Sequence, residues 1–313
     1  MSTGDRLDAL VAALKSAAEP TRLRLLALLS HGELAVGEIC KVLGQSQPRV
    51  SRHLRLLTEA GFLDRFREHQ CIYYRTPAHT TRYGWLRQLL DGMDRDEPQL
   101  RRDRERVAQV VAARGHAAKR ELERRPSAAP AGEDATEQFA AAVLAEVGPT
   151  GVGELLDIGT GTGGLRALLA RRARHAVGID ISAPALRLAR ARVHGAGFSH
   201  CEFHRGDMYE LPCEDAAFDT VTMDRVLADA QRPAAAIGEA ARALRPGGRL
   251  IVVDRFDRFD RLEGPATHPL QQLRRWFAQA GLETHRLRPC DLDCGHYLIA
   301  TARRAAAPGE SLR

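Results

Sequence analysis

ELLDIGTGTGG, residues 154–164, is the stretch of sequence that decides the fold. Its first residues form an apolar run typical of a buried strand, and a glycine-rich loop follows directly. Glycines at positions 159, 161 and 163 let another molecule approach the backbone closely, because no side chain stands in the way. A helix is expected from Leu165 onwards. Taken alone this pattern is weak, so its meaning depends on the segments that follow.

Those segments place two acids at the ends of strands. A second strand, Ala176–Asp180, ends in a carboxylate 23 residues after Asp157, and a carboxylate there can accept hydrogen bonds from both hydroxyls of a ribose. A third strand, Cys201–His204, leads to Gly206-Asp207-Met208, where the acid can bind an adenine amine. Both positions favour a bound adenine nucleoside.

Further short strands alternate with helical segments, which is the pattern of an α/β protein with a parallel sheet. The motif LRPGGRL, residues 244–250, precedes one of them. These strands would complete a seven-stranded sheet, and they are expected at Phe218–Met223, Leu250–Asp254, Glu283–Arg288 and His296–Thr301.

With these motifs in this order, residues from about Phe139 to Arg303 resemble the class I S-adenosylmethionine-dependent methyltransferases. The resemblance implies a Rossmann-like seven-stranded fold that binds S-adenosylmethionine (SAM) or its demethylated product S-adenosylhomocysteine (SAH). A nicotinamide-binding Rossmann domain is the structural alternative, but LRPGGRL and the Gly-Asp-Met motif belong to the methyltransferase pattern. The residues expected at the nucleoside are Asp157, Gly159, Thr160, Gly161, Gly163, Asp180, Ile181, Asp207, Met208, Met223 and Asp224.

The segment after the fourth strand, Met223-Asp224-Arg225-Val226, identifies no catalytic residue. Relatives that methylate nitrogen often carry Asn/Asp-Pro-Pro-aromatic there, and this chain does not. Asp224 and Arg225 can form an ion pair, one of them can contact the amino-acid end of the nucleoside, or Asp224 can bind loop backbone. Methyl transfer needs mainly in-line placement of donor and acceptor, so the missing motif does not exclude an enzyme. The catalytic residues stay unknown.

The apolar residues of the N-terminal part have helical spacing, and Gly32 and Gly44 mark the turns between helices. A helix is expected to open at Glu19-Pro20-Thr21, a second one over Leu34–Leu43, and a third over Ser46–Leu57 with Ser46 as its N-cap. Val50, Leu54 and Leu57 share the core-facing side of the third helix. Two β-prone runs, Phe62–Arg67 and Cys71–Thr76, then form a hairpin wing.

Gln, Arg and Ser at the start of the third helix suit insertion into the major groove, and the wing suits phosphate contacts. From Glu19 to Thr76 the chain resembles the ArsR/SmtB family, which implies an α+β winged helix-turn-helix, a homodimer and usually a repressor of double-stranded operator DNA. A winged helix that mediates protein contacts only is the alternative. The resemblance also implies a dimerisation helix over Thr80–Asp91 with Tyr83, Leu86, Leu89 and Leu90 as apolar positions. The residues expected at DNA are Ser46, Gln47, Arg49, Ser51, Arg52, His53, Arg55, Arg67, His69 and Gln70.

No metal site is expected. Arsenic sensors of this family carry two cysteines in the second helix of the motif, where this chain has Ala35 and Gly37, and these residues offer no thiolate. A zinc site from Cys290, Cys294 and His296 is disfavoured, because alternation along the expected last strand turns some of these groups apart.

Charge and composition agree with a DNA partner in a reducing compartment. Residues 1–125 hold 23 Lys and Arg against 16 Asp and Glu, whereas residues 126–313 hold 23 against 24. Six cysteines stand without a disulfide-framework spacing, and no run of apolar residues is long enough to span a membrane. The polar start of the chain has no signal-peptide core, so we expect a cytoplasmic protein.

Five segments are expected along the chain. They are a winged helix-turn-helix at 1–78, a dimerisation helix and charged connector at 79–125, a linker at 126–135, a methyltransferase-like domain at 136–305 and a tail at 306–313. The charged stretch Asp91–Arg125 is expected to form a solvated helix. The linker follows from its Pro, Ala and Gly content in PSAAPAGEDA.

The two resemblances together predict a DNA-binding regulator that takes SAH or SAM as its effector. Some ArsR-type regulators with such a C-terminal domain resemble repressors that respond to these nucleosides and control methionine-cycle genes. The segment between Asp254 and Leu270 is short and highly charged, and it offers little apolar surface for an acceptor substrate. The alternative is an active SAM-dependent methyltransferase of a small molecule, with an autoregulatory DNA-binding domain.

Overall fold

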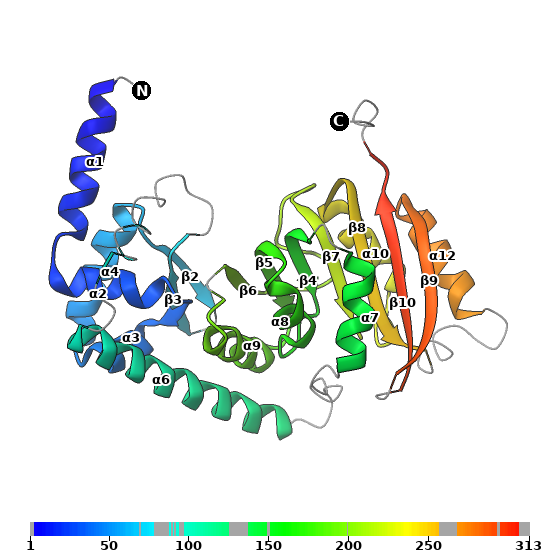
Figure 1. Ribbon diagram of the computed structural model, residues 1–313, viewed down its shortest axis with the longest axis horizontal. Coiled ribbons are helices and arrows are strands. Elements are labelled where there is room, and N and C mark those ends of the chain that lie inside the picture. Colours follow the sequence, from blue (N-terminus) through cyan, green and yellow to red (C-terminus); the bar gives the residue numbers. More distant parts are fainter. Residues whose placement is uncertain are drawn as a thin grey trace. The chain divides into compact units, whose positions relative to one another are not determined.

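The computed structural model describes residues 3–68, 70–77, 88, 90, 92–93, 97–124, 137–148, 151–198, 200–256, 268–292 and 295–306 (Figure 1). The chain divides into two compact units. Unit 1 comprises Met1–Ala117 and Arg190–His200, and unit 2 comprises Ala118–Ala189 and Cys201–Arg313. Within the described ranges no helix is both long enough and apolar enough to cross a membrane.

Unit 1 is built from helices with a small antiparallel sheet of order β1-β3-β2. Its elements are α1 (Thr3–Ala17), α2 (Pro20–Leu29), β1 (Leu34–Ala35), α3 (Val36–Leu43), α4 (Gln47–Glu59), β2 (Asp64–Glu68), β3 (Cys71–Arg75) and most of α6 (Pro98–Glu123). The hairpin β2–β3 is the expected wing, with Phe66 opposite Tyr73.

Local sequence signals explain where α2, α3 and α4 begin and end. The Glu19 carboxylate accepts a hydrogen bond from the Arg22 backbone N–H at 2.9 Å and caps α2. Gly44 ends α3 in the left-handed conformation, φ 64°. Ser46 is the N-cap residue of α4 as predicted, but its side chain makes no capping hydrogen bond. The predicted core positions of α4, Val50, Leu54 and Leu57, are all fully buried.

One expectation for unit 1 was wrong, and another, the charged helix now seen as α6, was right in its helix but not in its complete solvation. The helix expected over Leu34–Leu43 begins only at Val36, because Leu34 and Ala35 pair with Tyr74 and Tyr73 of β3. The charged connector is not simply solvated, since α6 buries Val107 and Val111 against the unit 1 core. The Thr80–Asp91 helix falls almost wholly outside the described residues.

Unit 2 contains a seven-stranded sheet of order β6-β5-β4-β7-β8-β10-β9, which confirms the predicted class I methyltransferase architecture. All neighbours from β6 to β8 are parallel, and β10 runs antiparallel between β8 and β9. The strands are β4 (Gly153–Ile158), β5 (Ala173–Asp180), β6 (Cys201–Arg205), β7 (Phe218–Asp224), β8 (Leu244–Arg255), β9 (Leu282–Leu292) and β10 (Gly295–Arg304).

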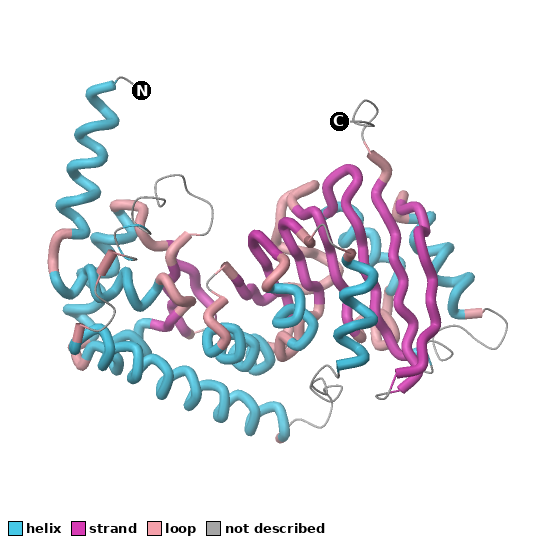
Figure 2. The backbone as a smooth tube through the Cα atoms, in the orientation of Figure 1, coloured by secondary structure: helices cyan, strands magenta, loops and turns pink. Residues whose placement is uncertain are grey.

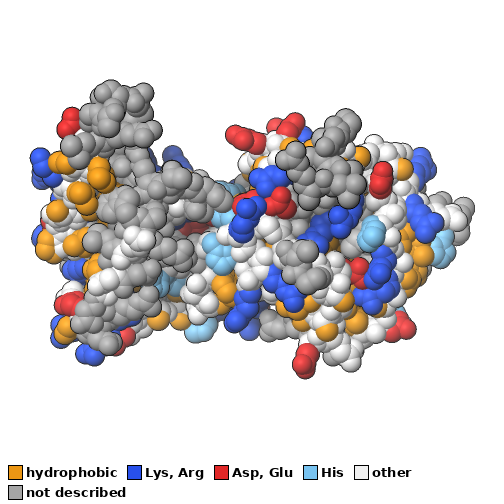
Figure 3. Space-filling model, turned by 45° about the horizontal axis from the view of Figure 1, so that its top comes forward, with side chains coloured by type: hydrophobic (Ala, Val, Ile, Leu, Met, Phe, Trp, Pro, Cys, Tyr) orange, Lys and Arg blue, Asp and Glu red, His pale blue; other side chains and the backbone are white. Residues whose placement is uncertain are grey.

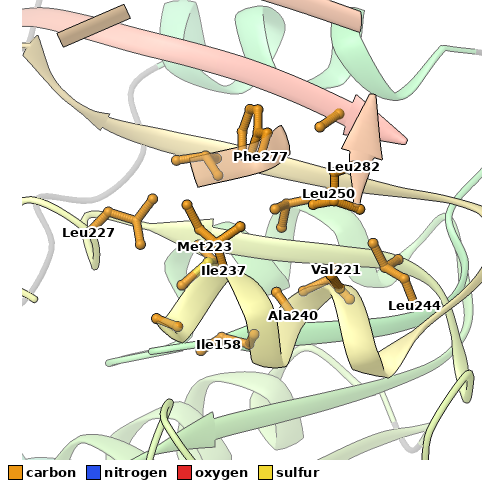
Figure 4. Close-up of a cluster of buried hydrophobic side chains, with 14 of the residues drawn as sticks. Ile158, Val221, Met223, Leu227, Ile237, Ala240, Leu244, Leu250, Phe277 and Leu282 are labelled. Atoms are coloured by element: carbon orange, nitrogen blue, oxygen red, sulfur yellow. The ribbon is translucent and has the colours of Figure 1, made fainter. Parts of the chain in front are cut away.

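Helices cover both faces of this sheet (Figure 2). They are α7 (Glu137–Val147), α8 (Gly164–Ala170), α9 (Ala183–Gly195, whose last residues belong to unit 1), α10 (Pro233–Ala243) and α12 (Pro269–Gln279). Ile237 of α10 and Phe277 of α12 pack with Val221 and Met223 of β7 in the main apolar core (Figure 4). Strand β8 begins before the predicted Leu250, because residues 245–248 belong to the strand and the pairing with β7 shifts register there.

Candidate functional site

The glycine loop follows β4 and has a backbone that only glycine adopts readily. Gly159, Gly161 and Gly163 have φ values of 67°, 53° and 82°. A Cβ built at Gly159 would overlap Cγ2 of Val226, which lies in the loop after β7. The Thr160 backbone N–H donates to the Ile179 carbonyl at 3.0 Å and fixes the glycine loop to β5. Because Gly159 has no side chain, Val226 can pack directly against the backbone of the glycine loop.

Asp180 stands at the carboxyl end of β5 with its carboxylate held by backbone. Its oxygens accept hydrogen bonds from the N–H groups of Gly161 at 2.8 Å and Ser182 at 2.7 Å. Burial raises the pKa of Asp180 above its ordinary value, although these hydrogen bonds oppose the shift. A carboxylate oxygen has a second lone pair, so both oxygens can still accept ribose hydroxyls. Ile181 beside it exposes 65% of its surface, which leaves an apolar side chain for a planar base.

Two of the expected residues are buried. The Asp157 carboxylate is 1% exposed and accepts a hydrogen bond from Thr222 Oγ1 at 2.7 Å. The Met223 side chain is fully buried in the core of Figure 4. These two positions can contribute their backbone to a site, whereas their side chains hold β4 and β7 in place. Thr160 Oγ1 is buried and has no hydrogen-bond partner among the described residues, so it offers a polar atom to a ligand.

Asp207 and Met208 follow β6 as expected. Asp207 is exposed and accepts a hydrogen bond from the Tyr209 backbone N–H at 3.0 Å, which shapes the turn. Met208 is half-buried against the main core. Strands β6, β5 and β4 are parallel neighbours. The turn after β6 and Asp180 at the end of β5 therefore both lie at the carboxyl ends of the strands.

The end of β7 carries an ion pair, one of the alternatives left open by the sequence. Both guanidinium nitrogens of Arg225 that face Asp224 bind its two carboxylate oxygens, at 3.2 and 3.1 Å. Burial raises the pKa of Asp224, and Arg225 opposes that shift. Arg225 has a left-handed backbone, φ 54°, which is uncommon for a residue with a side chain. The Asp224 and Arg225 side chains are 10% and 28% exposed.

Asp254 at the end of β8 was not among the residues expected at the site. It is 1% exposed and accepts hydrogen bonds from the N–H groups of Leu227, Ala228 and Arg255 at 2.9, 3.0 and 2.8 Å. Burial raises the pKa of Asp254 to about 6, the nearby Asp224 adds to the shift, and the three donors oppose it. The signal available in the sequence was an acid at the end of a strand, as at Asp180.

These residues fit an adenine nucleoside. Left-handed glycines, a buried Thr160 hydroxyl, the Asp180 carboxylate and the exposed Ile181 together supply close backbone, polar and apolar contacts. Among the described residues there is no group of three or more His, Cys, Asp or Glu that could hold a metal ion.

The second candidate surface is the start of α4 together with the wing. Ser46, Gln47, Arg49, Arg52 and Arg55 are exposed, and Ser51 is half-buried. Arg67 and Gln70 are exposed on the wing, and His69 lies outside the described residues. His53 points elsewhere, because its side chain is 14% exposed and Nδ1 lies 3.6 Å from a Glu19 carboxylate oxygen.

Comparisons with known proteins match both units. Residues 156–252 match the family described as methyltransferase domain, and residues 19–65 match the family described as bacterial regulatory protein, arsR family. The demethylmenaquinone methyltransferase of Thermus thermophilus is 41% identical over 105 residues, which are 32% of this chain and 46% of that protein. The demethylmenaquinone methyltransferase of Clavibacter sepedonicus is 35% identical over 108 residues, 34% of this chain and 43% of that protein.

The arsenical resistance operon repressor of Escherichia coli is 41% identical over 78 residues, which are 25% of this chain and 65% of that protein. This chain therefore spans less than half the length of the two methyltransferases and about two thirds of the repressor's. The crystal structure of a putative methyltransferase from Bacillus halodurans aligns with this chain at a TM-score of 0.46 and 20% sequence identity. The alignment covers 53% of this chain and 99% of the Bacillus halodurans chain.

One matched segment contains the helix-turn-helix of unit 1, and the other contains most of the parallel strands of unit 2. Residues 19–65 contain α2, α3 and α4, and residues 156–252 run from β4 into β8. The chain therefore joins a DNA-binding helix-turn-helix domain of the ArsR family to a methyltransferase domain of the class I fold.

Proposed function

We propose that the protein is a transcriptional repressor that binds double-stranded operator DNA and is controlled by SAH or SAM bound at the glycine loop. The observation that supports the proposal is the presence, in one chain, of an exposed start of α4 and of a glycine loop with left-handed glycines beside Thr160 and Asp180. A regulator with this effector would report the state of the methyl cycle, so genes of methionine and SAM metabolism are its expected targets. It would act in the cytoplasm, where DNA and both nucleosides are present.

We further propose that it acts as a homodimer through its N-terminal module. Helix α1 exposes Leu10, Val11 and Leu14, with 43%, 39% and 44% of their surfaces accessible, and apolar side chains reach the surface of unit 1 in Figure 3. A run of exposed apolar residues at helical spacing is typical of a contact surface. Two copies would read a two-fold symmetric operator.

Affinity for DNA measured at fixed salt, with and without each nucleoside, tests the proposal. The DNA would be a duplex that the full-length protein selects from a random-sequence pool. An effector is expected to change the dissociation constant about 5- to 150-fold, the usual range of allosteric coupling. An unchanged dissociation constant at saturating SAH and SAM would remove the effector role.

The second candidate is an active methyltransferase that also binds DNA. It is favoured by the complete seven-stranded sheet and by the similarity to quinone methyltransferases over about a third of the chain. Incubation with methyl-labelled SAM and a small quinol would separate the two. Stoichiometric release of SAH with labelled product supports the enzyme, whereas SAM recovered intact after binding supports the regulator.

A further inference from the structure

The loop after β7, residues 225–228, is anchored from β8 and not from its own strand. The ladder between β7 and β8 ends with Asp224 opposite Val253, and the Arg225 backbone N–H still reaches the Val253 carbonyl at 2.7 Å. Beyond that point one oxygen of Asp254 accepts both the Leu227 and the Ala228 N–H, while the other accepts the N–H of Arg255. A single side chain thus accepts two of the backbone N–H groups of this loop.

The same loop packs on the glycine loop. Val226 fills the space where Gly159 would carry a Cβ, and Leu227 is fully buried in the main core. Because Val226 directly precedes the two residues that Asp254 holds, the position of the Asp254 carboxylate sets how Val226 meets Gly159. The effect of Asp254 therefore reaches the nucleoside site through backbone and packing, without contact between Asp254 and a ligand.

The charges around Asp254 come from several elements. The Asp224 carboxylate of β7 adds negative charge beside it, and Arg225 interacts with both acids. Tyr297 of β10 interacts with Arg225 and stands opposite Arg255 in the ladder. Two buried carboxylates beside one arginine disfavour the ionised form of each other. The three N–H donors favour the ionised form of Asp254.

We propose that Asp254 is a positioning residue of the nucleoside site, whose ionised carboxylate holds the loop after β7 against the glycine loop. This inference rests on the proposed nucleoside site. A protonated Asp254 would turn one acceptor oxygen into a donor, so at least one of the N–H groups of Leu227, Ala228 and Arg255 would lose its partner. Nucleoside affinity is therefore expected to fall as the pH falls through about 6, by at most about tenfold per pH unit for one linked proton.

The first arm of the test needs no ligand. Amide hydrogen exchange of Leu227 and Ala228 would be measured in the full-length protein, in Asp254→Asn and in the control Asp215→Asn, which removes an exposed carboxylate paired with Arg242. Asparagine keeps the shape, but its amide N–H₂ would face the donor of Arg255. At about pH 7.5 we expect the amides of Leu227 and Ala228 to be protected about tenfold less in Asp254→Asn than in the wild type. Below about pH 6 the wild type should lose protection, whereas Asp254→Asn should show no further loss. Equal protection in the three proteins would overturn the proposal.

The second arm measures SAH affinity by calorimetry over the same pH range. We expect Asp254→Asn to bind SAH about five- to tenfold more weakly at about pH 7.5, with a smaller change of affinity around pH 6 than the wild type shows. A pH profile parallel to the wild type would overturn the proposal. If the wild type binds no SAH at any pH, the proposed function fails, and the exchange measurement still decides whether Asp254 holds the loop.

Val226→Ala keeps the Asp254 carboxylate and removes the packing on Gly159. This variant tests the proposal if Asp254→Asn does not fold. This variant should bind SAH more weakly while it keeps the pH dependence of the wild type. Affinity equal to that of the wild type would show that the loop does not act on the glycine loop, and would overturn the proposal.

Discussion

Gly159 has no room for a side chain, and its left-handed backbone disfavours one. Gly159→Ala would add both the strain of a positive φ and an overlap with Val226. We expect nucleoside affinity to fall at least about tenfold, because the loop must move to relieve the overlap. Gly148→Ala is the matched control, since Gly148 has φ 71° and open space around it. The control should lose about 1 kcal/mol of stability and no affinity for SAH.

Asp254 also predicts a pH dependence of folding. Its pKa is about 6 in the folded protein against 3.8 for the free group, so the folded state binds the proton more tightly. The stabilisation from this group is full below about pH 4 and is lost as the pH rises through about 6, a change of about 3 kcal/mol. Asp254→Asn removes the titrating group.

Denaturant unfolding of both proteins across this range checks the sign. The unfolding free energy of the wild type, relative to Asp254→Asn, should decline from about pH 4 to about pH 6 and then stay level. A difference that grows with pH would mean that Asp254 is stabilised as a carboxylate, against its burial. Asp180 titrates in both proteins, so its contribution cancels in the comparison, whereas Asp224 interacts with Asp254 and its change is part of the measured difference.

Helices α2 and α6 are tied together by one buried ion pair. The Arg24 guanidinium binds both oxygens of Asp103 at 2.6 and 2.8 Å, and Gln99 adds a third hydrogen bond at 3.0 Å. Asp103 is fully buried, so Arg24→Met would leave an uncompensated carboxylate and is expected to cost about 3–5 kcal/mol. The double variant Arg24→Met/Asp103→Leu should recover most of that loss. Urea unfolding in which the double variant is less stable than Arg24→Met would contradict this account.

Helix α4 is predicted to read bases, and the wing is predicted to contact phosphates. Arg49→Ala should weaken binding to the selected duplex by about 1–3 kcal/mol and leave non-specific binding nearly unchanged. Arg67→Ala should instead weaken both and lower the slope of affinity against salt by about one. Arg101→Ala, on the exposed side of α6, is the control. If Arg49→Ala weakened binding to the selected duplex and to non-specific DNA equally, α4 would contact only the DNA backbone.

The elements were predictable where local pattern determines them. The buried strand before Gly159 and the spacing of Val50, Leu54 and Leu57 follow from side-chain periodicity, and both agree with the structure. Contacts distant in sequence were not predictable. Leu34 joins a strand because Tyr74 is there to pair with it, and Asp254 acquires its role from amides 26 and 27 residues earlier. The motif at residues 244–250 was expected to precede a strand, but residues 245–248 lie inside β8 as an irregularity.

At the scale of the whole molecule, the charge asymmetry and the two matched domains agree with the proposal that different parts of the chain bind different partners. Excess positive charge lies in residues 1–125, which contain the helix-turn-helix, and residues 126–313 are nearly neutral. Electrostatic attraction to DNA would therefore act on the N-terminal part. The proposed nucleoside site lies in unit 2, so control of DNA binding by the nucleoside would be a coupling between two distinct sites.

Coupling of this kind is reciprocal, and that gives the most direct measurement. The dissociation constant of SAH would be determined by calorimetry for the full-length protein alone and saturated with its selected duplex, at one salt concentration. The account predicts that the two constants differ about 5- to 150-fold, by the same factor with which SAH changes the affinity for DNA. Identical constants for the free and the DNA-bound protein would contradict it.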